Sequence, residues 1–267
     1  MNFPVEIGGR RADFPARTVR PQQCPQPRMW TLWIPASIVL VRLLFPSPSV
    51  DIGVDELYCT RPAHRLDRPW VELCMVSSVD GTTEVSGRSG ALGNSTDAAV
   101  LRALRARADV VIVGSTTAHV ERYRAPSKPG QRIGVVTATG NVDTTLPLFA
   151  SGAGFLITTA EAPTHGLDVI RSHTSTVDLA DALAQLDAEI VHAEGGPTLN
   201  AALAAADLVD EINLTIAPHL VGGSGKRIVA PNDVEQLKTL DLVHVATDES
   251  FLFLRYARGG HFGSNTR

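Results

Sequence analysis

Residues 190–200 (IVHAEGGPTLN) constrain the fold more than any other part of the chain. The apolar run at 190–193 is typical of a short strand that is buried on both faces. Pro197 suits the first turn of a helix, which we expect over about 197–206 with an apolar side. The two glycines between strand and helix leave the backbone open to a phosphate or pyrophosphate facing the helix N-terminus. Tight packing of a strand against a helix gives the same pattern, and the stretch lacks the GxGxxG spacing.

A second stretch, Ser77-Ser78-Val79-Asp80-Gly81, follows an apolar run at 70–78 that predicts a central strand. Ligands of open α/β sheets gather where strands end at their carboxyl side. Asp80 is therefore a candidate for orienting a substrate or supplying a proton, although an Asx-turn would use the same residue. The Gly- and Ser-rich residues 82–93 predict either a mobile loop over a site or a plain linker.

A third stretch joins the strand expected at 109–114 to a short helix through Ser115, Thr116 and Thr117. These hydroxyls suit an anion or a ribose, or they simply cap the helix. Arg122 and Arg124 follow, and they fit either a substrate phosphate or a solvated loop.

Upstream, Asn94-Ser95-Thr96-Asp97 caps another expected helix. Arg105 lies at the edge of the buried face of that helix, four residues beyond Leu101. The arginines at 102, 105 and 107 together are typical of a solvated helix face.

Strands are also expected at 133–137, 154–158 and 189–194, with a helix over 177–187. Three alternating or apolar runs then close the chain at 208–218, 240–247 and 250–256. The order predicts an α/β fold with a mostly parallel central sheet, helices on both faces and a C-terminal antiparallel hairpin.

The domain organisation follows from a change in composition along the chain. Residues 69–258 form the expected compact domain, and 46–68 form a lead-in with a short helix at 50–58. The Pro-rich residues 1–45 predict an irregular arm and 259–267 a disordered tail. Alternatives for the arm are an export signal, a membrane anchor, or a true start of the protein near residues 39–41. Its apolar part is too short and too interrupted for a membrane span.

Charge and cysteine content exclude several classes of protein. The net charge of −4 without a basic stripe argues against a nucleic-acid partner. Cysteines at 24, 59 and 74 without a CxxC pair argue against a disulfide framework and a metal site. We therefore expect a cytoplasmic protein without metal or membrane contact.

Four stretches, taken together, resemble the reductase domain of the riboflavin-biosynthesis deaminase-reductase family. They are Ser78-Val79-Asp80-Gly81, Val111-Ile112-Val113-Gly114-Ser115-Thr116-Thr117, Glu194-Gly195-Gly196-Pro197-Thr198-Leu199, and Leu208-Val209-Asp210-Glu211 running on to Ile216-Ala217-Pro218. They occur in family order over about 69–258. The resemblance implies a dihydrofolate-reductase-like three-layer fold. It also implies NADPH-dependent reduction of the ribosyl group of 5-amino-6-(5-phosphoribosylamino)uracil, or of its 2,5-diamino precursor, to a ribityl group.

The resemblance also carries site residues over by position. The cofactor positions are Ser77, Thr117, Thr137, Thr139, Gly195, Gly196, Pro197, Thr198, Leu199 and Asn200. Arg105 and Glu194 match substrate positions, and Arg122 or Arg124 would help to hold the 5′-phosphate. Asp80 and Glu194 are the catalytic candidates, with Asp80 nearest the proton-handling step. The Gly195–Gly196 bond matches a pair that is cis in this fold.

The chain departs from the family pattern at several points. Cys74 stands where the family often has a lysine, and Glu121 matches a frequent Asp. The HxE and PCxxC motifs of the fused deaminase are absent, so a separate deaminase would act in the same pathway. The closing hairpin predicts a homodimer. A dihydrofolate-reductase-like pterin reductase and a non-catalytic NADPH-binding protein are the alternatives, because a fold does not fix a function.

Overall fold

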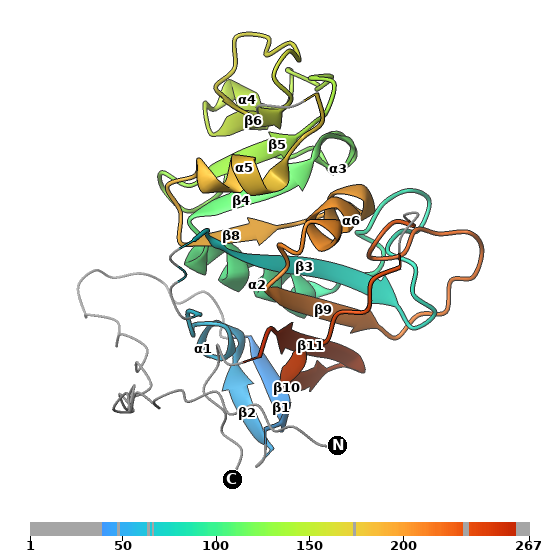
Figure 1. The fold of residues 1–267 in the computed structure, drawn as a ribbon. Coiled ribbons are helices and arrows are strands. Elements are labelled where there is room, and N and C mark those ends of the chain that lie inside the picture. Colours follow the sequence, from blue (N-terminus) through green and yellow to red (C-terminus); the bar gives the residue numbers. More distant parts are fainter. Residues whose placement is uncertain are drawn as a thin grey trace, which may run out of the picture.

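The computed structural model describes residues 39–46, 49–62, 65, 67–172, 175–231 and 235–259. Most of the expected N-terminal arm and nearly all of the expected C-terminal tail lie outside these residues. Within them, one sheet runs through the molecule in the order β2-β1-β10-β11-β9-β3-β8-β4-β5-β6-β7 (Figure 1). Helices lie on both of its faces, so the expected α/β architecture is confirmed.

Seven strands run parallel and build the larger part of the sheet. They are β9 (Glu211–Ala217), β3 (Trp70–Ser78), β8 (Ile190–Ala193), β4 (Val110–Gly114), β5 (Arg132–Val136), β6 (Gly154–Thr158) and β7 (Val169–Arg171). The antiparallel part adds β11 (Phe251–Ala257), β10 (Asp241–Asp248), β1 (Leu40–Phe45) and β2 (Val50–Gly53) beside β9. The parallel strands that were expected from apolar runs all form, which also confirms the mostly parallel sheet.

Alternating side chains of the parallel strands bury both faces of the sheet. On β4, Ile112 points to the core under α5 (Leu179–Ala184) and α6 (Pro197–Ala205). Val111 and Val113 point to the opposite core, under α3 (Ser115–Val120) and α4 (Pro147–Ala150). The face that α3 and α4 cover also carries α2 (Ser95–Arg107) and α1 (Val54–Leu57), which pack together over the antiparallel strands. The fold thus has the expected three layers.

The N-terminal boundary differs from the expectation. Residues 40–45, expected in an irregular arm, form β1 and pair with β10, and residues 50–53 form β2 instead of the start of a helix. Only Val54–Leu57 is helical. Val41 and Val54 explain the difference, because both are buried in the core beneath α2. The strand β10, with which β1 pairs, lies about two hundred residues further along the chain.

The cysteines also differ from the expectation. Cys59 is disulfide-bonded, although the number and spacing of the cysteines argue against a disulfide framework. Cys74 is a free thiol on β3, and its burial raises its pKa well above the usual value. Within the described ranges, no helix is long and apolar enough to cross a membrane, and no cluster of potential metal ligands occurs.

Candidate active site

The two glycines join the end of β8 to the start of α6, and they lie against the start of α3. The Glu194 N–H donates to the Ile112 carbonyl (3.0 Å) and the Gly114 N–H donates to the Gly195 carbonyl (2.7 Å). The Gly195–Gly196 peptide bond is cis, and Gly195 has a φ of +73°. A Cβ atom on Gly196 would lie only 2.6 Å from Thr117 Oγ1. The glycines are therefore required where the backbone between β8 and α6 approaches the first turn of α3.

Most of the expected cofactor residues lie at or just after the carboxyl ends of parallel strands. Ser77 lies near the end of β3, and Thr137 follows β5, whose Val136 is paired with Gly114. Thr137 is buried and its carbonyl accepts a hydrogen bond from Thr158 Oγ1 (2.6 Å), whereas Thr139 is exposed. The structure thus brings these positions to one edge of the sheet.

Within the run after the glycines, exposure separates the residues that a ligand can reach from those that hold the fold. Pro197 is half-buried and Thr198 is exposed at the first turn of α6. Leu199 is buried in the core beneath that helix. Asn200 is fully buried, and its Nδ2 donates to the Ile228 carbonyl (2.7 Å), which holds the segment after β9 against α6.

Glu194 lies at the centre of a compact polar cluster. Arg105 donates from Nε to Oε1 (2.5 Å) and from Nη2 to Oε2 (2.6 Å), and the Tyr123 hydroxyl also donates to Oε2. The Arg105 guanidinium lies 5.6 Å from the centre of the Tyr123 ring. Two segments far apart in sequence, α2 and the turn after α3, therefore converge on the residue that precedes the glycine pair.

This cluster keeps Glu194 ionised. Burial opposes ionisation, but contacts with Arg105 and His192 outweigh it and hold the pKa of Glu194 at about 2. Burial also disfavours the charged form of Arg105, and Glu194 more than compensates, so the pKa of Arg105 is raised. The side chain of Arg105 remains 27% exposed, which leaves part of the cation accessible to a ligand.

Arg122 and Arg124 do not enter the cluster. Both side chains are exposed, and within the described residues neither has an ion pair. Tyr123, the residue between them, is the one that contacts Glu194. Sequence analysis missed it because neither periodicity nor a motif marks a tyrosine inside the Glu-Arg-Tyr-Arg turn.

Asp80 has a different environment from Glu194. It accepts hydrogen bonds from Ser78 Oγ (2.5 Å) and from the N–H groups of Val221 (3.2 Å) and Gly222 (2.7 Å). These bonds hold the pKa of Asp80 at about 2, although the side chain is exposed. The geometry thus gives Asp80 the role of anchoring the turn at 221–222, and its part in the chemistry stays a prediction.

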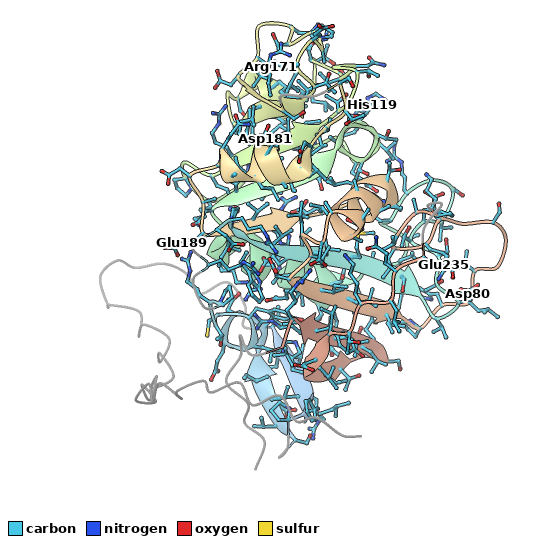
Figure 2. All side chains as sticks on the ribbon, in the orientation of Figure 1. Asp80, His119, Arg171, Asp181, Glu189 and Glu235 are labelled. Atoms are coloured by element: carbon cyan, nitrogen blue, oxygen red, sulfur yellow. The ribbon has the colours of Figure 1, made fainter. Side chains whose placement is uncertain are left out.

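The strand register separates Asp80 from Glu194. Leu73 is paired with Ala193, so Glu194 is level with Cys74. Strand β3 continues to Ser78, four residues further or about 13 Å, and Asp80 follows it at the far end of the strand (Figure 2). Both carboxylates lie beyond the ends of parallel strands, but they do not lie side by side.

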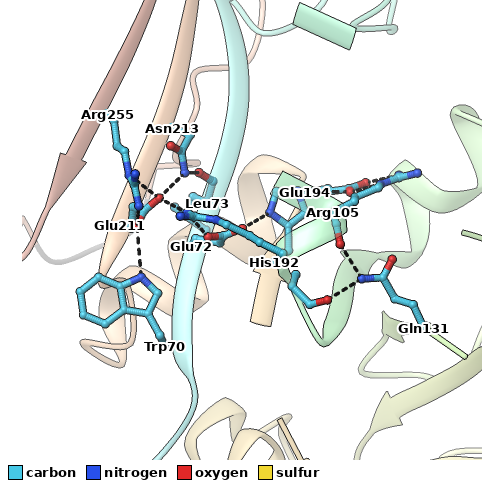
Figure 3. A network of polar contacts seen from close by, with 12 residues as sticks. Trp70, Glu72, Leu73, Arg105, Gln131, His192, Glu194, Glu211, Asn213 and Arg255 are labelled. Carbon is cyan, nitrogen blue, oxygen red and sulfur yellow. Dashed lines mark hydrogen bonds and ion pairs between the residues drawn. The ribbon is translucent and has the colours of Figure 1, made fainter. Parts of the chain in front are cut away.

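A network of buried charges lies directly behind Glu194 (Figure 3). His192 Nδ1 is 2.9 Å from Glu72 Oε1, and Arg107 Nη2 donates to both Glu72 and Glu211. Arg255 donates to both oxygens of Glu211 at 2.9 Å. The expected place of Arg107 on a solvated helix face is wrong, because its side chain is only 5% exposed. The feature of the sequence that could have indicated this buried network is a polar residue inside an otherwise apolar strand, such as His192.

A protein-family model matches most of the chain. The model of a family described as the RibD C-terminal domain matches residues 69–253. The chain belongs to this family. A comparison with curated proteins found no match.

Solved structures of RibD-related proteins share the fold. A pyrimidine reductase-like protein from Corynebacterium diphtheriae has a TM-score of 0.66 and 23% identity over 77% of this chain and 98% of its own. RibD from Acinetobacter baumannii has a TM-score of 0.62 and 20% identity over 72% of this chain and 58% of its own. The riboflavin biosynthesis reductase Rib7 from Saccharomyces cerevisiae has a TM-score of 0.54 and 19% identity over 73% and 92%. At these identities the structures support the fold, and the family match supports a reductase of riboflavin biosynthesis.

Proposed function

We propose that this RibD-family chain is an NADPH-dependent reductase that converts the ribosyl group of a phosphorylated ribosylamino-pyrimidine into a ribityl group. The observation that carries the proposal is the Arg105–Glu194–Tyr123 cluster, placed directly before the cis glycine pair at the carboxyl edge of the sheet. An ionised, buried carboxylate and a partly exposed guanidinium offer one acceptor and one cation to a single polar ligand.

The glycine pair fits a dinucleotide. Gly196 lies too close to Thr117 Oγ1 to accept a Cβ atom, and the first turn of α6 begins directly after it. Free N–H groups at the start of a helix favour phosphate oxygens. Gly196, Pro197, Thr198 and Thr117 would hold the pyrophosphate and its ribose, while Thr137 and Thr139 would lie toward the adenosine. When bound, NADPH supplies the hydride.

The residues of the chain would orient the substrate rather than exchange protons with it. Glu194, with a pKa of about 2, is an acceptor near neutral pH and would receive an N–H group of the pyrimidine or of its ring-opened imine. Arg105 would hold an oxygen of the sugar phosphate, with Arg122 and Arg124 adding positive charge nearby. Asp80 is likewise ionised near neutral pH, so in this scheme the proton that accompanies the hydride comes from solvent.

An apolar face of the antiparallel strands that stays partly exposed among the described residues supports a homodimer. The register aligns Leu252 with Ile216 and Leu254 with Leu214, in rows that point away from α2. Leu252 is 36% exposed. We propose that a second copy of the chain covers this face, as apolar sheet faces of this kind favour burial. The homodimer would work in the cytoplasm beside a separate deaminase. A mass of one chain by light scattering would refute the dimer.

NADPH oxidation, followed by absorbance, tests the reaction with three substrates side by side. They are the deaminated ribosylamino-pyrimidine phosphate, its diamino precursor and dihydrofolate. Turnover of either pyrimidine supports the proposal and fixes the order of deamination and reduction. Turnover of dihydrofolate alone would make the chain a pterin reductase, and NADPH binding without any turnover would make it a non-catalytic binding protein.

A matched pair of variants on α2 tests the role of Arg105. Arg105→Ala should raise the KM of the phosphorylated pyrimidine at least tenfold, roughly the loss of one charge-assisted hydrogen bond. Arg102 is exposed on the same helix, so Arg102→Ala should leave KM unchanged. An equal effect of both variants would contradict the assignment.

A further inference from the structure

His192 is a fully buried histidine between two carboxylates. Alternation along β8 turns it to the face beneath α2, where it is paired in register with Glu72 of β3. Its Nδ1 lies 2.9 Å from Glu72 Oε1. Its Nε2 lies 3.3 Å from Glu194 Oε1, at ion-pair distance but without the alignment of a hydrogen bond. The ring thus lies between Glu72 and Glu194, the carboxylate that Arg105 contacts (Figure 3).

The chemistry of these neighbours selects one protonation state. An ionised carboxylate only accepts hydrogen bonds, whereas a neutral imidazole has one nitrogen that can only accept. A neutral His192 would therefore turn a lone pair toward either Glu72 or Glu194. The imidazolium has a proton on both nitrogens, so Nδ1 can donate to Glu72 while the positive charge also lies within ion-pair distance of Glu194.

The other charged groups around the ring do not prevent His192 from being protonated, because the nearby arginines are each paired with a carboxylate. Arg107 contacts Glu72 from α2, and Arg105 contacts Glu194 from the same helix. From β4, the residue paired with His192 is Val111, which has no charge. Burial disfavours the imidazolium, but contacts with Glu194 and Glu72 outweigh it and raise the pKa of His192 to about 9. Tyr123 and Cys74, also close by, have pKa values raised well above their usual ranges.

We propose that His192 is a positioning residue: as a buried imidazolium held by Glu72, it fixes the carboxylate of Glu194 in the orientation that Arg105 and Tyr123 share. The effect on turnover rests on the proposed reductase function, whereas the protonation state and its effect on Glu194 do not. His192 would act on the substrate only through Glu194, without touching the substrate itself. It also makes the substrate side of the site sensitive to alkaline pH.

The kinetic test compares pH profiles of kcat/KM. In the unaltered protein, kcat/KM should fall as the pH rises through about 9, because the neutral ring no longer attracts Glu194. His192→Gln should lower kcat/KM at pH 7 about tenfold, the order of one hydrogen bond to a charged group, and should remove this alkaline limb. Glu72→Gln should instead move the limb to lower pH, since one of the two anions that hold the proton is gone. The Kd of NADPH should not change.

His244 provides the matched control. It is also a buried histidine on the α2 face of the sheet, but it lies beside Arg255, and its pKa is lowered to about 3 by burial and by that arginine. His244→Gln should keep the alkaline limb of the unaltered protein. An alkaline limb that persists in His192→Gln, or that disappears equally in His244→Gln, would overturn the proposal.

Nuclear magnetic resonance of the full chain gives a test that needs no turnover. The ring nitrogens of His192, assigned by comparison with His192→Gln, should have imidazolium shifts at pH 7, and those of His244 should have neutral shifts. The carboxyl carbon signal of Glu194 should shift in His192→Gln and stay in place in His244→Gln. A neutral His192 at pH 7, or an unmoved Glu194 signal, would overturn the proposal. Absence of turnover with every pyrimidine would count against the proposed function alone.

Discussion

Replacing Arg107 by leucine should destabilise the fold more than any surface substitution. Its guanidinium lies between Glu72 and Glu211, whose side chains are fully buried, and is itself only 5% exposed. Removing one partner of a buried ion pair costs about 3–5 kcal/mol, because the remaining charge is left without compensation. Glu211 keeps Arg255 and Glu72 keeps His192, so we expect the lower end, about 3 kcal/mol.

Urea unfolding at pH 7, followed by tryptophan fluorescence, measures this loss. Trp70, one of three tryptophans, donates from Nε1 to Glu211 Oε2, so its part of the emission reports on the network. A loss of about 3 kcal/mol corresponds to a melting temperature lower by about 6–12 °C for a chain of this size. Arg42→Leu is the control, because the Arg42–Asp51 pair is exposed (57% and 56%) and such pairs contribute about 1 kcal/mol or less.

A double-mutant cycle measures how strongly Arg107 and Glu72 are coupled. Glu72→Gln in the Arg107→Leu background removes one of the two carboxylates that have lost Arg107 as a partner, so the double variant should be more stable than additivity allows. If Arg107→Leu loses less than about 1 kcal/mol, the network does not stabilise the fold in the way its burial indicates.

Further predictions follow from the same geometry. Glu194→Gln should lower kcat/KM by about 10- to 100-fold with unchanged NADPH affinity, and an unaffected rate would remove Glu194 from the site. Gly196→Ala should weaken NADPH binding at least about tenfold by calorimetry, since its Cβ atom would lie 2.6 Å from Thr117 Oγ1; unchanged affinity would contradict this placement. Asp80→Asn should leave the rate between about pH 5 and 8 nearly constant while amide exchange at 221–222 accelerates; a large loss of rate would restore Asp80 to the chemistry. His192, with a pKa raised from 6.5 to about 9, should contribute stability that is complete below pH 6.5 and is lost as the pH rises through about 9. Urea unfolding of His192→Gln at both ends of this range should show no such loss.

The sequence predicts the parallel core well, because strands such as β4 and β6 are short apolar runs bounded by turn residues. The sequence does not predict β1, because the strand that pairs with it, β10, is about two hundred residues away. A local pattern of apolar residues does not show which distant strand will pair. The glycine pair and Thr117 were predicted to share the cofactor site from the family resemblance, which assigns both to it. The pairing of Arg105 with Glu194 was not predicted, although both residues were named.

The buried charge network could not be predicted from the sequence either. Arg107 follows the spacing of a solvated helix face, and only the three-dimensional position of Glu72 and Glu211 explains why a cation lies inside. Tyr123 contacts Glu194 through the turn after α3, whose direction no local pattern sets. A single sequence thus does not predict which charged residues of distant segments will form ion pairs in the site.

The hairpin of β1 and β2 precedes the region that the family model matches, yet it pairs with β10 inside that region. A chain shortened to residues 69–258 would keep every family motif and leave the outer backbone groups of β10 without partners. Open strand edges recruit strands from other molecules, so such a fragment should associate into oligomers of increasing size. The length of chain that the family model matches is therefore shorter than the length that forms the whole sheet.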